Sequence, residues 1–286
     1  MYEAEKRVRR YERLYGQRVL RPLLQSVFKV APEPEAGGVW LDWESGPGIL
    51  SLELVARMPR EATLLISEQD RAALRVLHSH HELEHDPRVF VRQDLPEEIT
   101  LADGVVDVAI GHWRWQYTAQ PERAMRELRR VVKPGGKIVL SFLQPGAGGT
   151  IHGALERAGA TDLAKALKDD GLTTSAVREC LRLDRIASIE VRSFQAQVAF
   201  GQSSRPMMDP LLLDFLLPRW MGRASGQEIT SVDEEMSIDL GHDPLTWEFK
   251  VGVALATVAG EATMQDEGTK AEPDTTKTPL PRSFTT

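Results

Sequence analysis

Leu41-Asp-Trp-Glu-Ser-Gly-Pro-Gly48 is the stretch that decides the fold. It joins residues 39–42, whose apolar character predicts a short buried strand, to residues 49–58, whose apolar pattern predicts a helix. Gly46 and Gly48 have no Cβ, so the backbone between strand and helix can turn sharply and approach a ligand closely. A strand, a glycine turn and a helix in this order are typical of open α/β sheets.

The pattern continues with alternating strands and helices joined by short connections. Predicted strands cover residues 63–66, 89–91, 105–110 and 137–142, and predicted helices cover residues 69–83 and 121–132. This alternation predicts a largely parallel sheet with helices on both faces. Ligands of such sheets lie at the carboxyl ends of the strands, which is where the glycine turn falls.

The N-terminal segment has a different character. Residues 1–30 mix Arg and Lys with apolar residues three and four positions apart, which predicts an amphipathic helix with a solvated basic face. Prolines and glycines in residues 31–38 end that helix. We therefore expect the main domain to begin near residue 36.

We expect this domain to extend to residue 260. Helices are predicted for residues 151–167 and 174–183 and strands for residues 186–200 and 247–258, with an insert at about 202–245. The apolar part of the insert, residues 207–220, would cover a pocket or serve as a docking surface. Residues 261–286 have scarcely any large apolar side chain, so a disordered tail is predicted.

Composition narrows the class of protein. The formal net charge of −7 argues against a protein whose main task is to grip nucleic acid, because phosphate binding demands a basic surface. Cys180 is the single cysteine, so no internal disulfide is possible. No apolar run reaches the roughly 18 to 20 residues of a membrane span, and we expect a cytoplasmic protein that acts on a small molecule or a protein.

Three stretches together resemble the class I S-adenosylmethionine-dependent methyltransferases. They are residues 41–48, residues 65–70, and the run from Asp94 through Val106-Asp107 to Gly136. The end of this run, residues 123–140, is the most specific stretch and contains Lys133-Pro-Gly-Gly136. The resemblance implies a doubly wound, mostly parallel, seven-stranded Rossmann-like sheet. The N-terminal helix and the C-terminal helical insert would be additions to it, and S-adenosylmethionine would be the cofactor.

The resemblance also implies a cofactor site. Its candidate residues lie at or just after the ends of four predicted strands, and they are Asp42, Glu44, Gly46, Gly48, Glu68, Asp94, Leu95 and Gly111. The glycines would hold the methionine part of the cofactor and Glu68 the two ribose hydroxyls. Asp94 and the amide of Leu95 would bind adenine, while Asp42 would bind the cofactor or simply brace the turn.

The methyl acceptor would lie beyond the fourth strand of the motif. His112 is the candidate catalytic base, and Trp113 and Trp115 are either substrate-binding walls or packing aromatics. His81 and His85 are four residues apart, a spacing that suits a metal, but no third ligand accompanies them and a solvated helix end is the preferred interpretation. We predict no metal site.

One position departs from the family pattern. Glu44 stands where these methyltransferases usually have glycine, close to the expected position of the cofactor's carboxylate and sulfonium. Like charges at that range cost on the order of a few kcal/mol. The resemblance makes a methyltransferase with a small-molecule acceptor the leading hypothesis. Because of Glu44, the alternative is a catalytically inactive methyltransferase fold used as a binding or scaffold module. A nucleotide-dependent oxidoreductase is disfavoured, because Lys133-Pro-Gly-Gly136 has no counterpart there.

Overall fold

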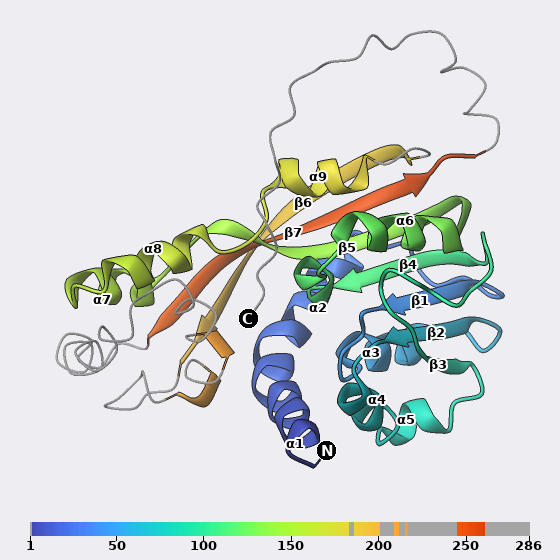
Figure 1. Ribbon diagram of the computed structural model, residues 1–286, viewed down its shortest axis with the longest axis horizontal. Coiled ribbons are helices and arrows are strands. Elements are labelled where there is room, and N and C mark those ends of the chain that lie inside the picture. The colour runs from blue at the N-terminus through green and yellow to red at the C-terminus, as the bar shows by residue number, and fades with distance from the viewer. Residues whose placement is uncertain (1, 183–185, 201–208, 212–214, 217–244, 261–286) are drawn as a thin grey trace, which may run out of the picture. The chain divides into compact units, whose positions relative to one another are not determined.

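The computed structural model of the protein describes residues 2–182, 186–200, 209–211, 215–216 and 245–260 (Figure 1). Most of the predicted insert and the whole of the predicted tail lie outside these residues. Among the described residues, no helix has the length and apolar character needed to cross a membrane.

A sheet of seven strands organises the fold, in the order β3-β2-β1-β4-β5-β7-β6. The strands are β1 (Val39–Trp43), β2 (Thr63–Glu68), β3 (Val89–Gln93), β4 (Val106–His112), β5 (Val132–Gly148), β6 (Ile186–Ala199) and β7 (Thr246–Val258). β1 pairs in parallel with β2 and β4, β2 with β3, and β4 with β5. The arrow of β7 runs opposite to that of β4 (Figure 1). The predicted doubly wound, mostly parallel sheet is confirmed.

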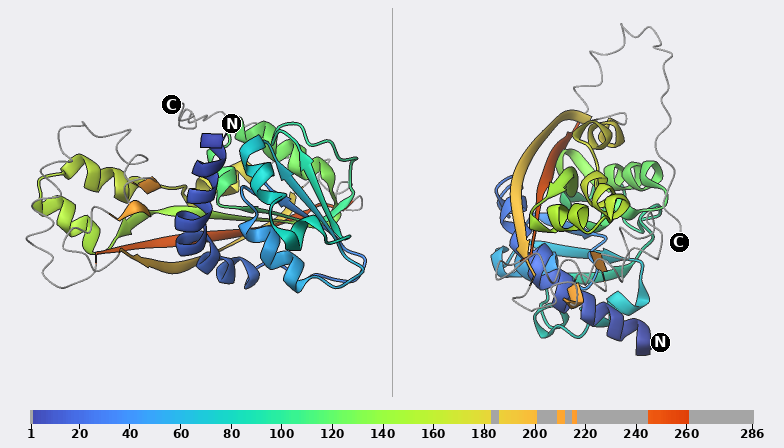
Figure 2. Two further views of the ribbon diagram at one scale, coloured as in Figure 1. Left: turned by 90° about the horizontal axis from the view of Figure 1, so that it is seen from below. Right: turned by 90° about the vertical axis from the view of Figure 1, so that its left-hand side faces the viewer.

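Helices lie on both faces of this sheet (Figure 2). Along the chain after the glycine turn, the helices are α3 (Ile49–Arg57), α4 (Arg71–Leu77), α5 (His81–Glu84), the short 3-10 helix η2 (Arg114–Tyr117), α6 (Pro121–Val131), α7 (Thr150–Arg157), α8 (Thr161–Asp169) and α9 (Thr174–Leu181). The N-terminal segment, predicted as one amphipathic helix, is helical in three consecutive parts, α1 (Tyr2–Tyr11), the π-helical η1 (Glu12–Leu20) and α2 (Arg21–Phe28).

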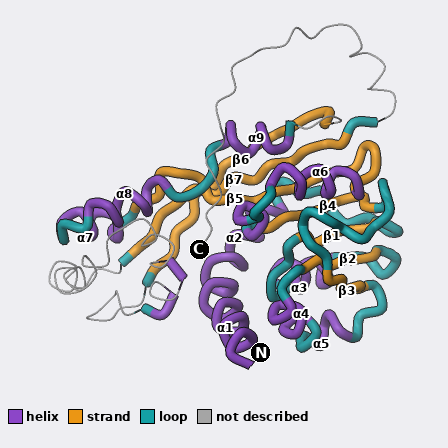
Figure 3. The backbone as a smooth tube through the Cα atoms, in the orientation of Figure 1, coloured by secondary structure: helices purple, strands orange, loops and turns teal. Residues whose placement is uncertain are grey.

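The chain forms two compact units. One unit contains the described residues of 30–141, 175–191 and 254–260, and the regular alternation of helix, strand and loop in Figure 3 belongs to it. The other contains residues 1–29, 142–174 and 192–253. All the candidate site residues belong to the first unit, so the site can be described within it.

The core of this first unit explains why the sequence forms a sheet here. β1 lies between β2 and β4, and Trp40, Leu41 and Trp43 are all buried in it. A strand covered on both faces needs a continuous apolar run rather than an alternating one, which is the pattern of residues 39–43. Burial of β1 holds the turn that follows it at the sheet edge.

Three elements differ from the sequence prediction. Lys133-Pro-Gly-Gly136 belongs to β5 instead of preceding it, and it leaves the ladder as a bulge, since Val106 pairs with Val132 and Val108 with Lys137. The predicted helix 69–83 is interrupted after Leu77, and the predicted helix 151–167 is interrupted at Gly159, whose φ is 74°. A left-handed glycine ends a helix, which the apolar spacing alone does not register.

Candidate functional site

The glycine turn, Glu44–Gly48, leaves β1 at the carboxyl edge of the sheet and leads into α3. Three of its residues have positive φ, 57° at Glu44, 60° at Gly46 and 93° at Gly48. Glycine adopts this backbone region without cost, whereas a residue with a side chain is strained there. Glu44 is therefore held in a conformation that suits the glycine usual at this place in the resembling family.

Glu68 ties the end of β2 to this turn. Its carboxylate is fully buried, and Oε2 accepts a hydrogen bond of 2.6 Å from the amide of Gly46. The other oxygen, Oε1, accepts from the amide of Asp70 at 2.8 Å. Oε1 also accepts from Nη2 of Arg114 at 3.5 Å, so Oε2 has capacity for a second donor and Oε1 has it only when Arg114 is displaced. The structure thus places Glu68 beside the glycine turn, and its role as a ribose-binding acid stays a prediction.

Arg114 lies over the turn and was not among the predicted site residues. It is the first residue of η2, and its Nη2 is 3.5 Å from Oε1 of Glu68. A Cβ built on Gly46 would come within 2.9 Å of the Arg114 Cδ, so the side chain of Arg114 occupies the space that a side chain at position 46 would need. Nothing in the spacing marks Arg114, because its contact depends on the strained φ of 68° at Trp113 before it.

Glu44 points toward the end of β2. Its side chain is buried, and Oε2 accepts a hydrogen bond of 3.3 Å from Nε2 of Gln69. Oε1 has no hydrogen-bond partner among the described residues. The pKa of Glu44 is raised from its ordinary 4.5 to about 7, chiefly by burial and also by the charge of Glu68, with Arg114 opposing the rise. An orphaned buried carboxylate oxygen suits a cation better than an anion.

Asp42 braces the start of the turn. Its Oδ2 accepts a short hydrogen bond from the hydroxyl of Ser51, which joins β1 to α3. The pKa of Asp42 is raised from 3.8 to about 7 as the net of burial, which raises it most, the hydrogen bond from Ser51, which lowers it, and the charge of Glu68, which raises it. Ser51 was missed in the sequence because a serine inside a helix carries no signal of its partner.

Asp94 is directed at its own loop. Oδ1 accepts hydrogen bonds from the amide of Thr100, at 3.2 Å, and from the hydroxyl of the same residue. Oδ2 lies 3.4 Å from Nε of Arg92. Leu95, the other proposed adenine contact, is 52% exposed and forms a bridge with Glu98. Both residues lie at the carboxyl edge after β3, and the contacts that they make there hold the connection to β4.

Ser141 organises the residues proposed for the methyl acceptor. Its hydroxyl is 2.6 Å from Nδ1 of His112 and accepts from the amide of Trp113 at 3.1 Å, while its carbonyl accepts from Nε1 of Trp115 at 2.7 Å. Both indoles are buried, with 1% and 2% of their surface exposed. At Gly111 a Cβ would come within 2.8 Å of Leu140, so this glycine permits close packing of β4 against β5.

The structure therefore brings one group of predicted residues together. Glu44 and Gly46 belong to the glycine turn, and Asp42 and Glu68 lie beside it. Arg114 is the further member of this group. Gly48 lies at the head of α3, where a Cβ would come within 2.6 Å of Leu77. Among the residues that the structure describes, no group of three or more His, Cys, Asp or Glu side chains could hold a metal ion.

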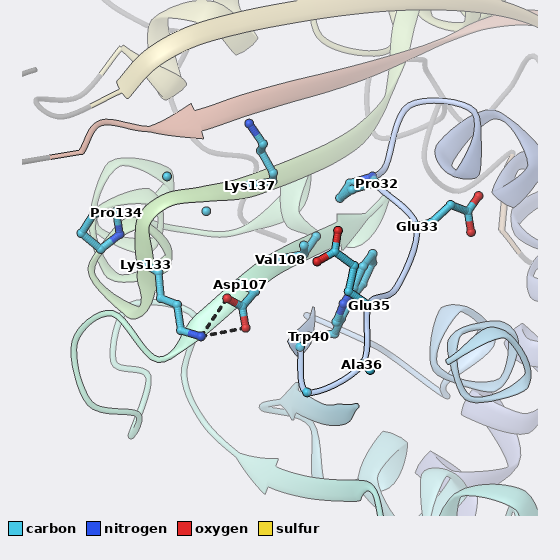
Figure 4. A pocket seen from close by; sticks show the side chains of 14 residues that line it. Pro32, Glu33, Glu35, Ala36, Trp40, Asp107, Val108, Lys133, Pro134 and Lys137 are labelled. Atoms are coloured by element: carbon cyan, nitrogen blue, oxygen red, sulfur yellow. Dashed lines mark hydrogen bonds and ion pairs between the residues drawn. The ribbon is translucent and has the colours of Figure 1, made fainter. Parts of the chain in front are cut away.

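A separate hollow of about 540 Å³ lies at the amino ends of β1, β4 and β5 (Figure 4). Lys133 and Asp107 point toward each other across it, with Nζ 2.7 and 2.8 Å from the two carboxylate oxygens. The same carboxylate accepts the amide of Val39 at 2.8 Å. These bonds link the start of β1 to β4 and β5, so Asp107 and Lys133 have a structural role in the sheet.

The fold and the glycine turn together define a class. Residues 41–140, about a third of the chain, match the family model described as a methyltransferase domain. No sequence among the curated proteins matches the chain.

Solved structures share the fold at low sequence identity. The YcgJ protein of Bacillus subtilis is 13% identical, with a TM-score of 0.56 over 83% of this chain and 97% of that one. Phosphoethanolamine N-methyltransferase 2 of Haemonchus contortus, in complex with S-adenosylhomocysteine and phosphomonomethylethanolamine, is 14% identical, with a TM-score of 0.52 over 90% of this chain and 58% of that one. The [4+2]-cyclase SpnF is 15% identical, with a TM-score of 0.50 over 84% and 81%.

Proposed function

We propose that the protein binds S-adenosylmethionine at the glycine turn and transfers its methyl group to a small-molecule acceptor. The observation that carries this proposal is the bond between Glu68 and the Gly46 amide, which joins a fully buried acid at the end of β2 to the turn after β1. The carboxylate offers acceptors for the hydroxyls of a sugar, and the backbone amides of the turn offer donors for a negatively charged group. The family of residues 41–140 supports the same cofactor.

The residues present fit this cofactor. Glu68 retains acceptor capacity for ribose hydroxyls, and the orphaned Oε1 of Glu44 suits a positive charge. When bound, S-adenosylmethionine supplies a methyl group on a sulfonium, and an acceptor lone pair bonds to the methyl carbon as the carbon–sulfur bond breaks. Such displacements depend chiefly on proximity and orientation. We assign His112 as the base for an acceptor that must lose a proton, with Ser141 holding its ring.

Isothermal titration tests the cofactor directly. The full chain titrated with S-adenosylmethionine should give saturable heat for one site. Absence of heat at high micromolar ligand would contradict the proposal. Methyl transfer is then sought by following S-adenosylhomocysteine release in the presence of small amines, phenols and carboxylates.

A second candidate is a methyltransferase fold that binds a partner without catalysis. Glu44 in the place of a glycine and the Arg114 side chain against Gly46 favour it, since both occupy the region of the turn. One structural neighbour is named a cyclase, so the fold does not fix the reaction. Glu44→Gly discriminates, because it should create cofactor binding only if the wild-type turn rejects the cofactor.

A further inference from the structure

The glycine turn has an unusual balance of charge. Three carboxyl groups, those of Asp42, Glu44 and Glu68, lie around it, and each is at least nine-tenths buried. The guanidinium of Arg114 lowers the pKa of both Asp42 and Glu44, so its charge acts on the whole group. In the structure, the guanidinium of Arg114 is thus the positive charge that stabilises these carboxylates.

Arg114 and a ligand of the turn would compete for the same space. The Arg114 Cδ lies 2.9 Å from the position that a Cβ of Gly46 would take, against the backbone that a ligand must approach. Its side chain is 29% exposed, so it has an outward route into solvent. Binding of an adenosyl compound therefore requires Arg114 to move away from Glu68.

Moving Arg114 has an electrostatic consequence. Buried carboxylates without a cation are strongly unfavourable, and a pair that loses one partner leaves that cost behind. A ligand with a positive charge in the same region offsets the loss, whereas a ligand that is neutral there does not. The orphaned Oε1 of Glu44 provides the acceptor for such a charge.

We propose that Glu44 and Arg114 make the turn selective for cationic adenosyl compounds, so that the sulfonium S-adenosylmethionine binds in preference to the neutral thioether S-adenosylhomocysteine. This inference rests on the proposed function, since both compounds are ligands of the same turn. It assigns a role in ligand specificity to Arg114, which no sequence motif marks, and makes Glu44 a residue that binds the ligand instead of one that obstructs it.

Calorimetric titration with three ligands tests the charge preference. The probes are S-adenosylmethionine, S-adenosylhomocysteine and sinefungin, a stable analogue with an amine in place of the sulfonium. We expect the two cationic probes to bind the wild type at least ~10-fold more tightly than the thioether. Glu44→Gln keeps the size of the side chain and should reduce this preference to within ~3-fold.

A variant of Arg114 tests the competition for space. Arg114→Met retains an aliphatic side chain without the charge, so the methionine can move away from Glu68 without breaking an ion pair. The variant should therefore bind both S-adenosylmethionine and S-adenosylhomocysteine more tightly than the wild type. Arg126→Ala removes an equal charge from the exposed face of α6 and serves as the control, with wild-type affinities expected. Circular dichroism verifies that each variant is folded, and Glu44→Gly replaces Glu44→Gln if the latter unfolds.

The outcomes separate the two proposals. Equal affinity of the wild type for the cationic and neutral probes overturns the charge preference while the cofactor site stands. Affinities unchanged by Arg114→Met overturn the competition. If no probe binds the wild type or any variant, the proposed function fails, and the selectivity proposed for its site fails with it.

Discussion

The two ends of the parallel strands use acids in opposite ways. At the amino ends, Asp107 and Lys133 form a close pair whose side chains are 36% and 41% exposed. At the carboxyl ends, Glu44 and Glu68 are buried, and Arg114 lies at a looser 3.5 Å from Glu68. Positive φ occurs without glycine at Glu44 and at Trp113, both at the carboxyl ends.

This difference indicates that the acids at the amino ends support the sheet and those at the carboxyl ends form a binding site. An exposed, closely paired acid is inexpensive to maintain and joins strands. A buried acid with an unsatisfied oxygen on a strained backbone lowers stability, and such features are characteristic of functional sites. The carboxyl-end group therefore has the properties of a binding site, and the amino-end pair has those of a structural fastening.

The largest effect is expected at Glu68. Glu68→Ala removes the acceptor for the amides of Gly46 and Asp70 and the proposed ribose contact. Affinity for S-adenosylmethionine should fall at least ~100-fold, since two charged hydrogen bonds to a ligand are worth about 1.5–3 kcal/mol each. Titration calorimetry measures the loss. Retained affinity in a folded variant would show that the ligand binds elsewhere.

The next effect concerns pH and Glu44. Its pKa is raised by burial from 4.5 to about 7, so the folded state holds a proton that the unfolded chain releases between these values. Stability should therefore fall as pH rises from 4.5 to about 7, and the raised pKa corresponds to about 3 kcal/mol. Asp42 has a similarly raised pKa and contributes in the same pH range, so Glu44→Gln should remove about half of this dependence in urea titrations at several pH values. An unchanged slope would exclude Glu44 as its source.

Gly46→Ala probes the turn itself. Its φ of 60° and the 2.9 Å approach of Arg114 Cδ to the added Cβ mean that the backbone is strained and Arg114 must shift. We expect a loss of about 1–2 kcal/mol in the free energy of unfolding, measured by urea denaturation. Gly135→Ala is the matched control, because its φ of 80° gives similar strain and no atom lies within 4 Å of the added Cβ. A larger loss at Gly135 would contradict the crowding at Gly46.

The smallest effect is expected at the amino ends. Asp107→Asn removes the charge paired with Lys133 but leaves an oxygen to accept the amide of Val39. Stability should fall by about 1 kcal/mol, since the pair is partly exposed, while cofactor affinity is unchanged. Thermal melting and calorimetry on the same sample test both parts. A changed affinity would mean that the two ends are energetically coupled.

Much of the fold could be predicted because its signals are local. The buried run of β1, the glycine turn and the helix after it are adjacent in sequence, and Glu68 follows a strand that pairs with β1. The break at Gly159 and the bulge at Lys133–Gly136 were not predicted, because apolar periodicity does not report a left-handed glycine or an irregular ladder. The break after Leu77 has no glycine and was not predicted either.

The candidate site was less accessible to prediction. The contact of Arg114 with Glu68 joins residues 46 positions apart, and its direction depends on the unusual backbone of Trp113. Ser141 meets His112 only because β5 pairs with β4. For Asp94, the sequence shows an acid after β3 but not that its carboxylate turns toward Thr100. Side-chain direction is set by packing, which a single sequence does not contain.

Amide resonances of the glycines give the most direct test. Gly46 and Gly48 belong to the turn proposed to bind S-adenosylmethionine, and Gly135 and Gly136 belong to the amino-end hollow. On addition of S-adenosylmethionine to the ¹⁵N-labelled protein, we predict saturable shifts of the Gly46 and Gly48 amides and none at Gly135 and Gly136. Unchanged Gly46 and Gly48 amides at saturating ligand would contradict a cofactor site at the glycine turn.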